Sequence, residues 1–198
     1  MTLTQELPAG PPAGQPDRPA AGIYTLDPVH TFVLFSARHL VIGRVVGRFD
    51  RLKGTITVTE RPEDWAVSAT IDGASLTTDW PERDDDLRGP DFFDVTRFPT
   101  IRFEGHGMRP ASDHWIMNGA LTIRELTVLV ALDVWFRGTA KTAPPRAGFH
   151  ASSAVRRADF GMRRDLITEI GTSIAPDVTI AIDAEATLDR RPCRTTRS

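Results

Sequence analysis

The sequence has a single cysteine, Cys193, which lies within the last six residues. An internal disulfide framework and a cysteine-based zinc site are therefore excluded. No run of about 18 apolar residues is present, which excludes a membrane-spanning helix. The N-terminus also lacks the basic and apolar regions of a secretory signal. We therefore expect a cytoplasmic protein with no integral membrane segment.

An excess of charge of one sign is also missing. The chain has 24 basic and 26 acidic residues and a formal net charge of −2, so it has no global field for nucleic acid or an anionic membrane. Nucleophile-elbow, dinucleotide-binding and Walker-type motifs are absent as well. The five histidines are dispersed, without the i, i+4 spacing of a zinc protease. These absences predict no nucleic-acid partner, no cofactor, no metal and no enzyme activity.

What is present fits one domain with two tails. A chain of 198 residues suits a single core. Residues 1–21 contain five prolines and no aromatic residue, so they cannot bury enough surface to fold and are predicted to be disordered. We expect the folded domain over residues 22–189 and a basic, flexible tail over residues 190–198.

Most of the predicted domain has the pattern of β-strands. Residues 65–72 alternate between an apolar face and a mostly polar face, as a half-buried strand does. Residues 126–136 include the longest apolar run, in which one face would carry Val128, Val130, Leu132, Val134 and Phe136. Residues 31–37 are mostly β-branched or aromatic, which predicts a strand buried on both faces. Three glycines predict bulges or bends of a sheet that curls closed, namely Gly43, Gly47 and Gly54. The pattern predicts an all-β fold, an eight-stranded antiparallel barrel with a short helical insertion.

The helical insertion is expected between Ser75 and Gly105. A helix is predicted in the segment ERDDDLR, ended by Gly89 and Pro90, before a strand resumes at Thr100. Three consecutive acids lack the spacing of a calcium loop and are predicted to face solvent, namely Asp84, Asp85 and Asp86. Apolar side chains of this stretch are expected to close one side or end of the barrel as a lid, namely Leu87, Phe92, Phe93 and Phe98.

A barrel of eight strands either encloses one slender ligand or is filled by its own side chains. The residue pattern alone does not decide between these two interiors. A filled barrel would be a structural or dimerisation module. A barrel whose interior held convergent titratable groups would instead be an enzyme or a stress-response factor acting on a small apolar substrate.

Five pieces of the sequence carry a family resemblance, in order: YTLDPVHTFVLFSARHL (24–40), VVGRFDRLKGTI (45–56), LRGPDFFDVTRFPTIRFEG (87–105), NGALTIRELTVLVAL (118–132) and RRADFGM (156–162). With them the chain resembles the YceI-like family, whose members have a lipocalin-like barrel fold and are regarded as polyisoprenoid-binding proteins. The resemblance implies a long-chain isoprenoid of the quinone or polyprenyl phosphate type, threaded into the barrel for storage, shielding or transport. The partners we expect are this lipid and a second copy of the chain in a homodimer.

The chain departs from the family pattern at two places. Residues 125–130 read ELTVLV, where the family usually has glycine, Val-Thr, a basic residue and Pro-Val. The hairpin geometry of the family is therefore not carried over to these residues. Asp86 stands where a histidine commonly precedes the leucine, so no headgroup or metal role is carried over to that position.

The resemblance and the alternation together predict the residues that contact the ligand. The apolar candidates are Phe32, Leu34, Trp65, Val67, Ile71, Phe92, Phe93, Phe103, Trp115, Met117, Val130, Leu132, Val134 and Phe149. The polar candidates for the headgroup are His30, His39, Arg38 and Arg157. His30 and His39 flank one predicted strand, and we expect them close to a mouth of the barrel.

Overall fold

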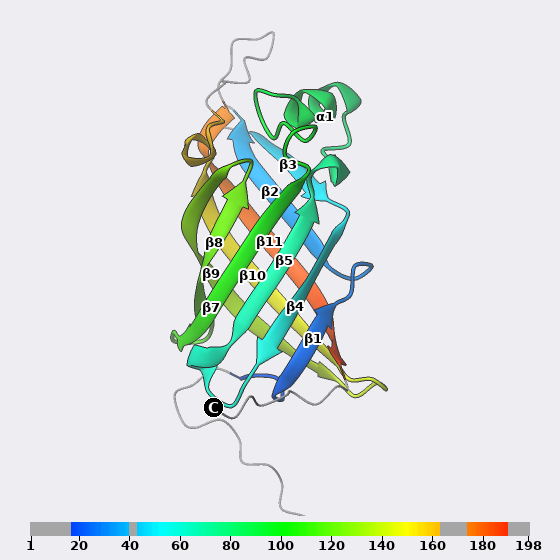
Figure 1. Ribbon diagram of the computed structural model, residues 1–198, viewed down its shortest axis with the longest axis vertical. Coiled ribbons are helices and arrows are strands. Elements are labelled where there is room, and N and C mark those ends of the chain that lie inside the picture. Colours follow the sequence, from blue (N-terminus) through cyan, green and yellow to red (C-terminus); the bar gives the residue numbers. More distant parts are fainter. Residues whose placement is uncertain (1–16, 40–42, 163–173, 190–198) are drawn as a thin grey trace, which may run out of the picture.

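The computed structural model describes residues 17–39, 43–162 and 174–189 of the chain (Figure 1). Its strands are β1 (Gly22–Leu26), β2 (Phe32–His39), β3 (Gly43–Phe49), β4 (Leu52–Val58), β5 (Ala66–Asp72), β6 (Leu76–Thr77), β7 (Thr100–Pro110), β8 (Trp115–Ile123), β9 (Leu126–Ala140), β10 (Arg146–Arg156) and β11 (Ile174–Asp189). Its helices are η1 (Pro62–Asp64), η2 (Gly73–Ser75), α1 (Pro81–Arg88) and η3 (Arg157–Phe160). None of these described helices is long and apolar enough to cross a membrane.

The strands form one closed antiparallel sheet. Their order is β1-β4-β5-β7-β8-β9-β10-β11-β2-β3-β6, and a further pairing of β1 with β11 closes the barrel. Three of the eight barrel strands are each broken in two: β2 continues β1, β4 continues β3 and β6 continues β5. The eight-stranded antiparallel barrel predicted from the sequence is confirmed.

Strand β2 differs from its prediction because it has one outer face. Val33, Phe35 and Ala37 face the interior, whereas Phe32 is 49% exposed. Leu34 lies on the same outer face as Phe32, since neighbouring side chains of a strand alternate. Every strand of a closed barrel turns one face outward, so an apolar run does not require burial on both faces.

The glycines predicted to mark bulges or bends, namely Gly43, Gly47 and Gly54, do not interrupt their ladders. The registers of β3 and β4 with their partners β2 and β5 are regular. A Cβ on Gly47 would lie 2.2 Å from Cζ of Phe35, so this glycine makes room for an inward-facing ring. The ladder shifts instead at other positions, including Gly107, where φ is +72°, and Gly148. The extra residues, Gly107 and Arg137, lie on the long strands β7 and β9, which these irregularities bend.

A cap segment, defined here as residues 73–99, covers one end of the barrel beside η3 (Figure 1). Its helix α1 begins at Pro81, where a missing N–H costs nothing, and ends at Arg88 before Gly89. Strand β7 begins at Thr100. The predicted helix end and strand start are therefore confirmed.

The opposite end of the barrel is closed by tryptophans. Trp65 and Trp115 are each 1% exposed, and their rings stack with centroids 5.9 Å apart. The indole N–H of Trp65 donates to the carbonyl of Thr59 at 2.9 Å, and that of Trp115 donates to Asp17 at 3.1 Å. Residues 17–21 of the predicted tail therefore include a contact with the barrel, and Pro19 is buried. Residues 1–16 and 190–198 of the predicted tails lie outside the described residues.

Candidate functional site

The barrel encloses an apolar cavity of about 250 Å³. Inward-facing side chains of successive strands form its wall, and those of β5 and β11 illustrate the alternation: Val67, Ala69 and Ile71, and Val178, Ile180 and Ile182. The cap segment adds Leu87, Phe92 and Phe93. The wall therefore offers a ligand apolar contact along the barrel and beneath the cap.

Eleven of the residues predicted to contact a ligand line this cavity. They come from β5, β7, β8, β9 and β10, from the cap segment and from η3. They are Val67, Ile71, Phe92, Phe93, Phe103, Met117, Val130, Leu132, Val134, Phe149 and Arg157. Their position in the wall is a finding, whereas their contact with a ligand stays a prediction.

Four apolar candidates do not line the cavity. Phe32 and Leu34 lie on the outer face of β2, so the prediction for them is wrong. Trp65 and Trp115 are buried, but they pack on each other at the end of the barrel opposite α1. Trp65 precedes β5 and Trp115 begins β8, so both rings sit where strands enter the barrel and act as its floor.

Most of the polar candidates are also placed elsewhere. His30 precedes β2 and His39 ends it, so an eight-residue strand of about 26 Å separates them. They therefore do not share a mouth. His30 is exposed and lies within 3.0 Å of Asp27, Arg38 is exposed, and neither lines the cavity. The side chain of His39 lies outside what the structure describes.

The predicted site missed Arg83, which lines the cavity from α1 together with Leu87 one turn later. A position four residues before Leu87 falls on the same helix face, and this spacing was the available signal. The prediction also missed Phe35, Phe160 and Met162. Phe98, expected to close the cavity, does not line it, and its ring instead lies under the guanidinium of Arg97 at 5.0 Å.

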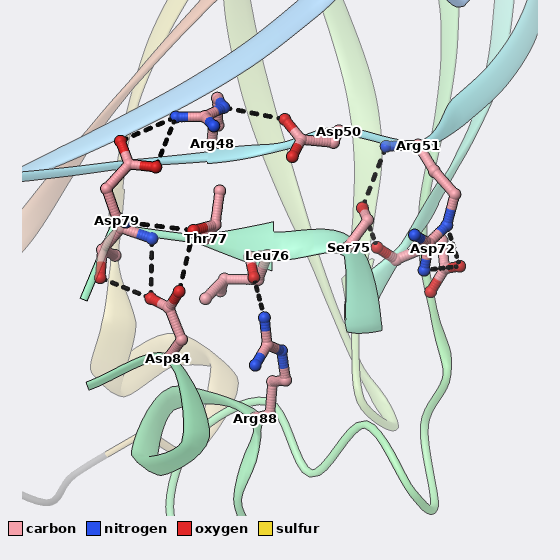
Figure 2. A network of polar contacts seen from close by, with 11 residues as sticks. Arg48, Asp50, Arg51, Asp72, Ser75, Leu76, Thr77, Asp79, Asp84 and Arg88 are labelled. Atoms are coloured by element: carbon pink, nitrogen blue, oxygen red, sulfur yellow. Dashed lines mark hydrogen bonds and ion pairs between the residues drawn. The ribbon is translucent and has the colours of Figure 1, made fainter. Parts of the chain in front are cut away.

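A buried carboxylate, Asp84, ties helix α1 to residues 77 and 78 of the cap segment, where β6 pairs with β3 of the barrel (Figure 2). Asp84 is 5% exposed and accepts three hydrogen bonds, from Thr77 Oγ1 at 2.8 Å, Thr78 N at 2.7 Å and Thr78 Oγ1 at 2.5 Å. The prediction that all three consecutive acids face solvent is therefore wrong for Asp84, while the side chain of Asp85 is 83% exposed. Arg88 adds a hydrogen bond to the carbonyl of Leu76.

These contacts decide the protonation of Asp84. Burial alone would raise its pKa, but the hydrogen bonds from Thr78 and Thr77 and the charge of Arg88 together outweigh burial and lower it. Hydrogen bonds to the ionised form have this effect. The carboxylate is therefore charged whenever the cap segment is in place near neutral pH.

The junction beneath the cap segment carries further ion pairs (Figure 2). Arg48 of β3 pairs with Asp50 at 2.9 Å and with Asp79 at 3.0 Å. Arg51 pairs with Asp72 at 2.9 Å, and Ser75 Oγ accepts from the backbone N–H of Arg51. The contacts of Asp79 and Ser75 join the cap segment to the bend between β3 and β4.

A second polar cluster lies at the break between β1 and β2. Oxygens of Asp27 and Glu185 and a ring nitrogen of His30 lie within 4.8 Å of one another. Arg146 pairs with both carboxylates, at 2.7 Å to Asp27 and 3.1 Å to Glu185. The hydrogen bond with His30 is the largest of the contacts that lower the pKa of Asp27 to about 2. This cluster is an ion-pair network joining β10 and β11 to the break, and it does not line the cavity.

These features define the class of protein: a closed antiparallel β-barrel that encloses an apolar cavity beneath a helical cap. A comparison with models of protein families identifies the family within this class. The YceI-like domain matches residues 24–186, and the chain belongs to the YceI-like family.

Similar proteins agree with this membership. The chain is 32% identical over 140 residues to UPF0312 protein plu2095 of Photorhabdus laumondii, covering 69% of this chain and 73% of that one. Protein YceI of Shigella flexneri matches with the same identity and coverage. The crystal structure of the Campylobacter jejuni YCEI protein is similar with a TM-score of 0.66 and 26% identity, covering 77% of this chain and 90% of that one.

More distant structures share the fold alone. Burkholderia cenocepacia BcnA superposes with a TM-score of 0.71 at 20% identity, covering 82% of this chain and 99% of that one. A polyisoprenoid binding domain from Saccharophagus degradans, implicated in plant cell wall breakdown, superposes with a TM-score of 0.62 at 14% identity, covering 86% and 100%.

Proposed function

We propose that this protein binds a long-chain isoprenoid lipid, of the isoprenoid quinone or polyprenyl phosphate type, inside the barrel for storage, shielding or transport. The observation that supports this most is the wall of the cavity, in which almost all lining side chains are apolar. The name of the Saccharophagus degradans domain, a polyisoprenoid binding domain of the same fold, points to the same ligand class.

The physical argument rests on the shape and polarity of the two partners. A prenyl chain is apolar along its whole length, and burying apolar surface contributes about 25 cal/mol per Å². Phenylalanine, valine and isoleucine side chains line the cavity from β2 to β11. A chain threaded along the barrel would therefore bind without a charged partner along its length.

An enzyme or stress-response factor acting on a small apolar substrate is the competing function. General acid–base chemistry needs titratable groups within hydrogen-bond reach of the substrate. Among the described residues that line the cavity, only Arg83 and Arg157 carry ionisable side chains. Arginine stays protonated in proteins, so this wall favours binding over proton transfer.

Filling the cavity from its wall tests the proposal. Ala69 of β5 lines the cavity, and Ala69→Phe would place a ring inside it. We expect at least tenfold weaker binding of the C20 alcohol geranylgeraniol, measured by displacement of a fluorescent lipid, because about 1.4 kcal/mol of lost contact is tenfold. The matched control is Ala131→Phe, since Ala131 of β9 is exposed on the barrel exterior. Equal affinities of the two variants and the wild type would contradict the proposed site.

Cytoplasmic location and a homodimer remain predictions. Cell fractionation tests the first, and light scattering of the purified protein at several concentrations tests the second. A protein found outside the cytoplasm, or a mass of one chain at all concentrations, would contradict them.

A further inference from the structure

The two arginines of the cavity wall form its most polar feature. Arg83 comes from α1, and Arg157 begins η3. The other lining residues are apolar except for Thr31 and Ser153, whose hydroxyl groups donate to the carbonyls of Glu185 and Ala131. A guanidinium beside an apolar cavity is costly unless an anion or good acceptors face it.

Arg83 is held in place by its own neighbours. Its Nε donates to Thr78 Oγ1 at 2.7 Å, and its Nη2 donates to the carbonyl of Thr78 at 3.0 Å. Both acceptors are neutral, and within the described ranges the ion pairs of the cap segment involve Arg48, Arg88 and Arg97 but not Arg83. The side chain is therefore oriented by hydrogen bonds while its charge stays available.

Arg157 lies at the same end of the barrel as Arg83. Helix η3 follows the end of β10 and lies at the same end of the barrel as the cap segment (Figure 1). Arg124 connects the two elements, because it donates to the carbonyl of Phe92 at 3.4 Å and also lies beside Gly161, which ends η3. The two guanidinium groups thus enter the cavity wall from two elements that cover one end.

We propose that Arg83 and Arg157 form a headgroup site that selects isoprenoids with an anionic headgroup, whether phosphate or carboxylate, over neutral ones. Arginine binds both kinds of anion through paired N–H donors. The apolar surroundings strengthen such contacts relative to water. The inference rests on the proposed function and orients the ligand, with its headgroup beneath the cap segment and its chain directed toward the tryptophan floor.

The test compares three C20 ligands that share one chain: geranylgeraniol, geranylgeranoic acid and geranylgeranyl diphosphate. We expect the wild type to bind at least one of the two anions about tenfold or more tightly than the alcohol, which is the effect expected of charge-assisted hydrogen bonds. Arg83→Met and Arg157→Met should each reduce this preference and leave the affinity for the alcohol within about twofold. Inorganic pyrophosphate alone should bind weakly, since it lacks the chain.

Arg156→Met is the matched control. Arg156 immediately precedes Arg157, but its side chain is 73% exposed and pairs with Asp177 at 3.6 Å outside the cavity, so this variant should keep the full preference. Equal binding of alcohol and anions by the wild type would overturn the headgroup site, and this comparison needs no variant. The same conclusion follows if both Arg83→Met and Arg157→Met keep the wild-type preference. If no C20 ligand binds, the proposed function itself fails.

Discussion

The two ends of the barrel are closed by different kinds of contact. The floor, Trp65 and Trp115, is a stacked pair of buried rings whose N–H groups both have backbone acceptors. The cap segment instead combines smaller buried side chains, such as Leu87 and Phe92, with polar contacts, in which Asp84 ties α1 to residues 77 and 78 and Asp79 pairs with Arg48 of the barrel. Apolar stacking and fully satisfied donors stabilise the native state as a whole. Polar contacts within a short segment can break while the barrel stays folded.

This difference identifies the end through which a ligand would pass. Opening the floor requires exposing two large indole rings, whereas opening the cap segment exposes smaller buried side chains, including Leu87 and Phe92, and breaks its polar contacts with the bend between β3 and β4. The arginines of the cavity wall also lie at the cap end. We therefore expect the floor to govern stability and the cap segment to govern ligand exchange.

The largest expected effect follows from removing half of the floor. Trp65→Ala deletes a buried ring, its stacking on Trp115 and its hydrogen bond to Thr59, and should lower the free energy of unfolding by about 3–5 kcal/mol. Urea unfolding followed by circular dichroism measures this loss. Trp80→Ala is the control at the cap end, because Trp80 is 59% exposed, and it should stay within about 0.5 kcal/mol of the wild type. Similar losses in both variants would contradict the assignment of the floor.

Asp84→Ala is expected to lower stability less than Trp65→Ala does, but to speed up ligand exchange more. This change leaves the buried N–H and hydroxyl of Thr78 without their acceptor, at a cost of about 1–3 kcal/mol that falls mainly on the cap segment. Release of bound geranylgeraniol, measured by stopped-flow fluorescence, should be about tenfold faster or more. Asp85→Ala, which changes an exposed neighbour, should release the ligand at the wild-type rate. An unchanged rate in Asp84→Ala would show that the cap segment does not retain the ligand.

The smallest effects are pH dependences of opposite sign at the two ends. The pKa of Asp84 is lowered in the folded protein. Its contribution to stability is therefore complete above the pKa of the unfolded chain, about 4, and is lost as pH falls through the folded pKa. The pKa of His114, beside the floor, is raised, chiefly by its hydrogen bond to Asp113 at 2.8 Å. The contribution of His114 to stability is therefore complete below the pKa of the unfolded chain, about 6.5, and is lost as pH rises through the folded pKa.

Two measurements separate these responses. Ligand retention on gel filtration should fall between pH 5 and pH 3 in the wild type, and this fall should be smaller in Asp84→Asn. The stability difference between the wild type and His114→Gln, measured by urea unfolding, should shrink between about pH 6 and pH 9. A His114 difference that grows with pH would contradict the sign of the shift.

The barrel could be predicted because alternation along a strand depends on local sequence. The alternation correctly indicated inward-facing side chains of β5 and β9, namely Val67, Ala69, Ile71, Val130, Leu132 and Val134. The end of the helix before Gly89 was also predicted correctly. Phe32 and Leu34 were misplaced because β2 carries apolar side chains on both faces, and periodicity cannot then identify the outer one. Trp65 was misplaced because it continues the alternation of β5 at the point where the barrel ends.

Contacts between distant segments lay beyond the sequence pattern. The burial of Asp84 depends on α1 lying against residues 77 and 78, and an acidic run gives no local sign of that. The spacing of Arg83 and Leu87 places both on one helix face, but only the position of α1 over the barrel brings that face to the cavity. The polar part of the site therefore required the three-dimensional arrangement.

The most direct test of the central claim is mass spectrometry of lipid extracted from the purified wild-type protein, with Ala69→Phe and Ala131→Phe purified in parallel. We predict an isoprenoid lipid in about equimolar amount with the wild type and with Ala131→Phe, and a marked depletion with Ala69→Phe. An extract of the wild type without any isoprenoid, together with no binding of added geranylgeraniol, would contradict the account.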